Sequence, residues 1–107
     1  MAIYLSDDNF EKEVLESALP VMVDFYADWC APCRMMSPLV EEIEEEYRDK
    51  IKVCKMNAGD FPKVPEKLKI MSLPTFALFL NGSMVKSIVG AVDKNTLLEL
   101  AECCVNW

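Results

Sequence analysis

The sequence predicts an α/β fold in which a single central mixed sheet of five strands is flanked by four helices. Short apolar segments alternate with segments of helical periodicity along the chain, which is the pattern of strands joined by helices. An Asn-Gly pair at 81–82 separates two strand-like segments and is the strongest short hairpin signal. The 107 residues contain neither a repeat nor a Pro- or Ser-rich linker, which indicates one domain spanning residues 1–107.

The chain begins with a predicted strand and a predicted helix. Residues 3–5 are short and apolar enough for a strand. Ser6 and the two aspartates after it offer caps for a helix over residues 10–17, and Pro20 marks the break after that helix.

The second strand and second helix follow directly on one another. Residues 21–27 are apolar on both faces except at Asp24, which is typical of a central strand covered on both sides. Pro32 suits the first turn of the next helix, where its missing N–H costs nothing. Apolar residues then repeat at helical spacing as far as Tyr47.

The remaining elements complete the order β-α-β-α-β-α-β-β-α. They are predicted over residues 51–57 (strand), 65–68 (short helix), 75–80 and 83–89 (hairpin) and 94–103 (last helix). Strands joined by helices should be parallel and the hairpin antiparallel, so the sheet should be mixed.

The charge balance argues against two kinds of partner. The net charge is −7, and both nucleic acids and anionic membranes need a basic surface. No apolar segment reaches the ~20 residues of a membrane span, and the N-terminus lacks the pattern of a signal peptide. We therefore expect a protein of the reducing cytosol. One run of acidic residues is either a solvated helix face or an electrostatic docking patch: Glu41, Glu42, Glu44, Glu45 and Glu46.

Two cysteines in the segment V-M-V-D-F-Y-A-D-W-C-A-P-C lie where a strand ends and a helix begins. The first helical turn presents unpaired N–H groups and a partial positive charge, which favour a thiolate. We expect the pKa of such a cysteine to fall below the free value of ~8.5, and the thiolate is the species that attacks disulfides. Cys30, at the helix entrance, should be exposed, whereas Cys33 should point toward the body of the protein. Two cysteines three residues apart can cycle between dithiol and disulfide.

Other roles for this pair fit the sequence less well. Zinc needs four ligands, and the chain has no histidine and no second close pair of cysteines. Covalent haem needs a histidine after the second cysteine, where this chain has Arg34, and iron–sulfur clusters need more cysteines nearby. An inert structural disulfide is the remaining alternative. The βαβ setting favours redox catalysis, without a metal or a bound cofactor.

Asp24 is the carboxylate that interrupts the apolar second strand. Alternation along the strand places it on the face of Met22 and Tyr26, where burial should raise its pKa. Near Cys33 it could take the proton of that thiol, directly or through one water, and so create a second nucleophile. The alternative is a structural aspartate satisfied by a backbone or lysine partner.

Three further cysteines are ambiguous. Cys54 alternates with its neighbours in a strand and is expected to be a small core residue. Cys103 and Cys104 are adjacent on a helix and face different directions, so at least one should be exposed. They are either inert thiols or a regulatory or dimer-forming pair.

The whole combination resembles the thioredoxin family from Asp7 to about Ala101. The matching stretches are V-D-F-Y-A-D-W-C-A-P-C-R-M, V-C-K-M-N, S-L-P-T-F and the N-G hairpin followed by V-G-A. The resemblance implies the thioredoxin fold and a monomeric protein-disulfide reductant that has no bound cofactor. Such a protein carries two electrons from thioredoxin reductase to target proteins and serves cell redox homeostasis. A flavoprotein reductase and a ferredoxin-dependent reductase are both compatible with the sequence.

The resemblance also implies roles for individual residues. Cys30 would be the attacking thiolate and Cys33 the resolving thiol. Asp24 would be the buried acid/base, with Lys55 as its charge neighbour. The surface that binds substrate would comprise Trp29, Ala31, Pro32, Leu73, Pro74, Val89, Gly90 and Ala91.

Within that surface, Pro74 matches the cis-proline of the family, so the Leu73 backbone could pair with an extended substrate, as in strand addition. Gly90 is expected where two backbone segments approach closely. The chain departs from the family pattern at Ala31 and Ser72, where glycine is commoner, and at Gly59, where aspartate is frequent. These departures bear on the choice of partners rather than on the chemistry.

Two other functions compete with disulfide reduction. A disulfide oxidant or isomerase of the same fold usually has histidine before the second cysteine, where this chain has Pro32. A non-enzymatic binding module would keep its function without Cys30. The intact cysteine pair with its upstream aspartate favours the reductant.

Overall fold

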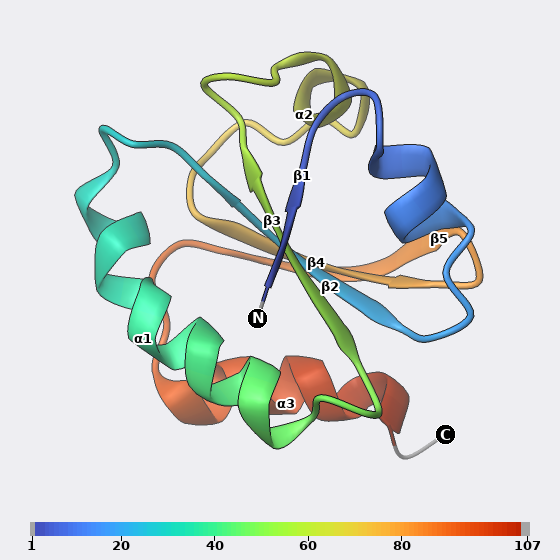
Figure 1. The fold of residues 1–107 in the computed structure, drawn as a ribbon. Helices are drawn as coiled ribbons and strands as arrows, with labels where there is room; N and C mark the ends of the chain where they lie inside the picture. The colour runs from blue at the N-terminus through green and yellow to red at the C-terminus, as the bar shows by residue number, and fades with distance from the viewer. Residues whose placement is uncertain (1, 106–107) are drawn as a thin grey trace.

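A computed structural model describes the backbone of residues 2–105 and the side chains of residues 2–103. One five-stranded sheet, in the order β1-β3-β2-β4-β5, runs through the protein (Figure 1). β1 and β2 both pair in parallel with β3, while β4 pairs antiparallel with β2 and with β5. The predicted mixed sheet is confirmed. The strands are β1 (Ile3–Leu5), β2 (Val21–Tyr26), β3 (Lys52–Asn57), β4 (Thr75–Leu80) and β5 (Ser83–Val89).

Helical segments join the strands and cover both faces of the sheet. They are η1 (Glu11–Leu15), α1 (Ala31–Glu46), α2 (Lys63–Lys67) and α3 (Lys94–Val105). α1 and α3 lie on one face of the sheet (Figure 1), and their side chains pack together there. Side chains of η1 and α2 belong to the core cluster on the other face. The predicted order of elements is confirmed. Within the part of the chain that the structure describes, no helix is long and apolar enough to cross a membrane.

Alternation along β2 divides the core in two. Met22 belongs to the cluster under α1 and α3, with Val40, Ile43, Phe76 and Leu97. The alternate residues of β2 point to the other face of the sheet, where they join the cluster that η1 and α2 cover. They are Val21, Val23 and Phe25. A strand buried on both faces is what its apolar sequence predicts. Asp24 therefore lies on the face that α1 covers.

The hairpin forms as its Asn-Gly pair predicts. Asn81 has φ +52° and Gly82 has φ +83°, and two successive residues with positive φ are the requirement of a type I′ turn. This turn matches the twist of the strands it joins, so β4 and β5 pair along most of their length. The pairing brings Val89, at the end of β5, opposite Thr75, at the start of β4.

The first helix differs from the prediction. In place of an α-helix over residues 10–17, the chain forms the π-helical segment η1, in which the Glu16 amide donates to the Glu11 carbonyl oxygen at 3.0 Å. The segment is short because Ser17 starts a turn, in which its hydroxyl oxygen accepts from the Leu19 amide at 3.2 Å. At the other end Ser6 Oγ accepts from the Asn9 amide at 3.2 Å within the turn that precedes η1. The N-cap residue of η1 is Phe10, which makes no side-chain cap hydrogen bond, so the predicted capping of this helix is wrong.

The short helix α2 begins two residues earlier than predicted. Asp7, which lies 57 residues earlier in the sequence, accepts a hydrogen bond from the Val64 amide at 3.0 Å. A first-turn amide of the helix is thereby satisfied by a carboxylate that a local sequence pattern does not include. α2 ends at Lys67 with Leu68 as its C-cap residue, and Lys69 follows with φ +61°.

The structure shows the burial of two of the three additional cysteines, Cys54 and Cys103. Cys54 is fully buried, and burial raises the pKa of its thiol to about 12, which fits the predicted core residue. Cys103 is a half-buried free cysteine that packs against the core. The side chain of Cys104 lies outside the described residues.

Candidate active site

Cys30 and Cys33 lie at the N-terminus of α1, just beyond the end of β2. They form a disulfide, and their Cα atoms are 5.3 Å apart. Cys30 is the N-cap residue of α1, with φ −93° and ψ 105°, and its Sγ accepts from the Cys33 amide at 3.2 Å. Pro32 occupies the first turn without leaving an amide unpaired. The strand-to-helix junction predicted for the pair is confirmed.

The exposure of the two cysteines differs from the prediction. Cys30 is 5% exposed and Cys33 is 4% exposed, so both are buried. Tyr26 and Leu73 pack against the pair. The expectation of an exposed Cys30 is wrong for the disulfide form, because the two cysteines form a buried cluster with Ala27 against which Tyr26 and Leu73 pack. A helix position alone cannot show this packing.

Asp24 is a buried carboxylate next to this pair. It is 3% exposed, and among the residues that the structure describes its Oδ1 has no hydrogen-bond partner. Burial raises the pKa of Asp24 to about 6, and the attraction of Lys55 lowers it by less. Lys55 faces Asp24 across the parallel pairing of β2 with β3. Asp24 Oδ1 thus lacks a hydrogen-bond partner among the described residues, while Lys55 is the charge neighbour of the carboxylate.

A cavity of about 170 Å³ connects the Asp24 carboxylate with Cys33. Asp24 lines it from β2, Lys55 from β3, and Cys33 and Ser37 from α1. Since a water molecule occupies about 30 Å³ of liquid volume, the cavity has room for water to carry a proton between Asp24 and Cys33. Asp24, Lys55 and Cys33, which the sequence analysis grouped together, therefore line the same cavity.

The residues predicted to bind substrate lie around the disulfide. Trp29 is 76% exposed, and Ala31 and Pro32 are exposed at the start of α1. The Leu73–Pro74 peptide bond is cis, as the family pattern predicts. The Gly90 amide donates to the Pro74 carbonyl oxygen at 2.8 Å and so fixes the segment 89–91 beside the proline.

The two backbone segments at Gly90 do approach closely, as predicted, because the Gly90 amide donates to the Pro74 carbonyl oxygen. This approach is not the reason for glycine, because a Cβ atom built on Gly90 would have no heavy atom within 4 Å. The backbone instead has φ +96°, a region that residues with a side chain rarely adopt. Glycine is therefore required here by conformation and not by crowding.

Comparison with known proteins bears directly on this site. Residues 1–102 match the family model described as thioredoxin. The chain belongs to the thioredoxin family. It is 50% identical over 99 residues to a thioredoxin of Rickettsia bellii, which covers 92% of this chain and 94% of that protein.

Two more distant relatives extend the comparison. Thioredoxin 1 of Synechococcus elongatus is 47% identical over 97 residues, which cover 91% of each chain. The chloroplastic M-type thioredoxin of Chlamydomonas reinhardtii is 44% identical over 102 residues, covering 95% of this chain and 73% of that protein. The thioredoxin fold is thus confirmed, and the Cys30–Cys33 pair is the redox-active disulfide of a thiol–disulfide oxidoreductase.

An apolar groove beside the disulfide was not predicted from the sequence. It has a volume of about 570 Å³ and lies between Trp29, Ile70, Met71 and Leu73, with Pro65 of α2 in its wall. Met71 is 92% exposed, the largest exposed fraction among the large hydrophobic side chains of residues 2–103. A methionine in a loop gives no sequence signal of its exposure, so tertiary structure was needed to find this groove.

Proposed function

We propose that this chain reduces target disulfides by a two-step exchange in which Cys30 attacks and Cys33 resolves. The Cys30 thiolate attacks one sulfur of the target disulfide, whose S–S bond breaks to release one target thiolate. The Cys33 thiolate then attacks Cys30 Sγ, breaks the mixed disulfide and releases the second target thiolate. The target gains two electrons and two protons, and the chain is left with the Cys30–Cys33 disulfide.

Asp24 is the acid/base of this exchange in our proposal. The observation that carries the proposal is the cavity that Asp24 shares with Cys33, in which Asp24 Oδ1 has no protein partner among the described residues. A carboxyl group whose pKa is raised to about 6 can accept a proton from Cys33 near neutral pH and return it when the disulfide is reduced again. Lys55 moderates the rise in the pKa of Asp24.

The target binds across the surface that surrounds the pair. Trp29 and Val89 are exposed on it, and Leu73, next to the pair, offers backbone groups to an extended segment of the target. Ala31 and Pro32 complete this surface at the start of α1, and Pro74, Gly90 and Ala91 complete it on the side of β5.

We also propose an electron donor, a cellular location and an oligomeric state for this chain. A thioredoxin reductase, either a flavoprotein or a ferredoxin-dependent enzyme, resets the Cys30–Cys33 disulfide and docks where the targets dock. The cysteine pair itself carries the two electrons, so the reaction needs no bound cofactor. We place the chain in the cytoplasm as a monomer that maintains the redox state of protein thiols.

The proposal is tested by mixing the fully reduced chain with insulin, whose interchain disulfides report protein-disulfide reduction. We expect each chain to reduce one insulin disulfide and to lose the mass of two hydrogen atoms. Peptide mapping should then place the new disulfide at Cys30 and Cys33, with Cys54 and Cys103 still free. A new disulfide at any other cysteine, or intact insulin, would refute the assignment.

A further inference from the structure

We propose that Ser37 is a positioning residue: its hydroxyl holds the Lys55 ammonium beside Asp24 and so fixes the charge that Asp24 meets during thiol exchange. The catalytic meaning of this inference rests on the acid/base role proposed above for Asp24. The placement of the ammonium can be tested separately from that role.

The contact itself joins α1 to β3. Lys55 Nζ donates to Ser37 Oγ at 3.2 Å. Ser37 lies four residues after Cys33 on α1 and lines the same cavity as Cys33 and Asp24. Lys55 is only 7% exposed, and a buried ammonium needs an acceptor. Ser37 supplies one from the helix that also carries the resolving cysteine.

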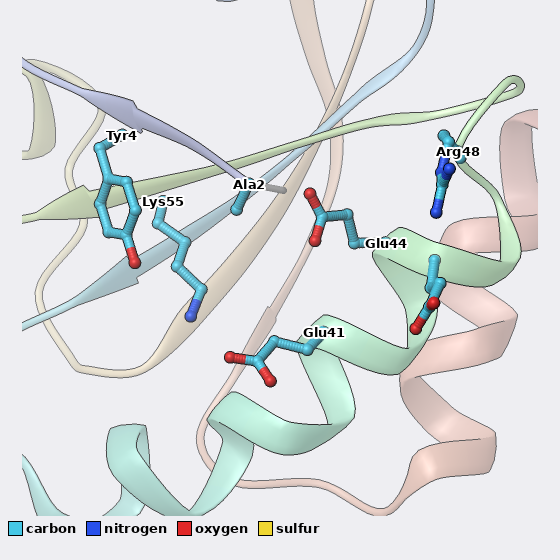
Figure 2. A pocket seen from close by; sticks show the side chains of 7 residues that line it. Ala2, Tyr4, Glu41, Glu44, Arg48 and Lys55 are labelled. Atoms are coloured by element: carbon cyan, nitrogen blue, oxygen red, sulfur yellow. The ribbon is translucent and has the colours of Figure 1, made fainter.

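A second pocket competes for the same ammonium. It has a volume of about 440 Å³, and Lys55 lines it together with Tyr4, Glu41, Glu44, Glu45 and Arg48. Figure 2 shows the Lys55 side chain reaching from its strand toward the α1 side chains, with its ammonium on the side of Glu41. Lys55 thus lies between an inner cavity lined by two aspartates, Asp24 and Asp28, and an outer pocket lined by three glutamates.

The balance of charges decides where the ammonium goes when the hydroxyl is removed. The outer pocket has three glutamates against Arg48, whereas the inner cavity has two aspartates against Arg34. The outer pocket is also wide enough for water, so it can solvate and attract the ammonium. Without Ser37 Oγ, Lys55 should turn outward and away from Asp24. The carboxylate then loses its neighbouring cation, and its pKa should rise further.

The other charged groups around Asp24 are the same in the wild type and in Ser37→Ala. The remaining charged or titratable groups that line its cavity are Tyr4 from β1, Tyr26 from β2, Asp28 from the segment after β2 and Arg34 from α1, and Cys33 does not titrate in the disulfide form. Replacing Ser37 by alanine changes none of them and removes no charge. A change in the titration of Asp24 would therefore report the displacement of Lys55.

The experiment follows the side-chain carboxyl carbon of Asp24 by ¹³C NMR in the disulfide form of the whole chain. For Ser37→Ala we expect the titration midpoint to move up by about half a pH unit or more, the effect of losing a nearby cation. Ser37→Thr retains the hydroxyl and should keep the wild-type midpoint. Ser87→Ala, on the exposed strand β5, is the matched control and should change nothing.

A double variant tests whether Ser37 acts through the lysine. Ser37→Ala combined with Lys55→Met should give the same midpoint as Lys55→Met alone. An unmoved or lowered midpoint in Ser37→Ala, or an added shift in the double variant, would overturn the inference. If the midpoint rises as expected while exchange rates stay unchanged, the placement of Lys55 stands and the acid/base role of Asp24 fails.

Discussion

Replacing Cys33 by serine is expected to turn the chain from a catalyst into a covalent trap for its targets. Cys30 can still attack a target disulfide, but the serine hydroxyl cannot break the mixed disulfide that results. Turnover should fall by a factor on the order of 10³ or more, as is usual when a nucleophile is lost. After mixing the reduced variant with insulin, non-reducing electrophoresis should show a complex that dithiothreitol releases.

Two serine variants control for this trap. Cys30→Ser leaves Cys33 in place and should form no complex, because it lacks the attacking thiolate. Cys54→Ser should behave like the wild type, because Cys54 is fully buried and the pKa of its thiol is about 12. If Cys33→Ser traps nothing while Cys30 still reacts with iodoacetamide, the resolving role of Cys33 is wrong.

Replacing Asp24 by asparagine is expected to slow disulfide exchange at pH 7 by roughly 10²-fold, the lower end of what a positioned acid/base contributes. The amide keeps the shape of the carboxyl group but cannot exchange a proton with Cys33 through their shared cavity. Stopped-flow rates of insulin reduction from pH 5 to pH 9 would measure the effect. Equal rates of variant and wild type across this range would refute the acid/base assignment.

Asp24→Asn is expected to slow disulfide exchange but to make the folded chain more stable. A slower rate in this variant therefore cannot be explained by unfolding. The folded-state pKa of Asp24 is about 6, against 3.8 as its ordinary value. Between these two values the folded chain binds more protons than the unfolded chain, so stability falls as the pH rises. Above pH 6 the full loss remains, which is at most about 3 kcal/mol for a difference of this size. Asp24→Asn should escape that loss at pH 7.

Urea unfolding at two pH values measures this difference. The variant should be more stable than the wild type at pH 7, and the advantage should shrink toward pH 4, where the wild-type carboxyl group is protonated in the folded chain. A difference that is the same at both pH values would contradict the raised pKa of Asp24.

Local sequence patterns correctly predicted the features of this fold that depend on neighbouring residues. Alternation in β2 placed Asp24 on one face of the sheet, and the two positive φ values at Asn81 and Gly82 follow from the needs of a two-residue hairpin. The position of Cys30 and Cys33 at a helix entrance followed from Pro32 and the strand before it. Each of these features depends on residues within a few positions of one another.

Apart from the first helix, which a local turn at Ser17 shortens, the missed features depend on contacts between distant segments. The start of α2 depends on Asp7, which is far from Val64 in the sequence. The burial of Cys30 depends on Leu73. Ser37 gave no signal, because a serine on an amphipathic helix is usually solvent-facing, and its contact with Lys55 exists only once α1 packs on β3. Such contacts are set by tertiary packing, which local periodicity does not encode.

A redox titration of the purified chain in dithiol/disulfide buffers tests the central claim most directly. Trp29, next to Cys30, is the fluorescent probe, and Trp107, which lies outside the described residues, is first replaced by phenylalanine. We predict one two-electron transition at about −270 mV, a value already known for thioredoxins and not obtained from this structure. A midpoint at about −120 mV, the value of a strong disulfide oxidant, or the absence of any transition would show that the chain is not a disulfide reductant.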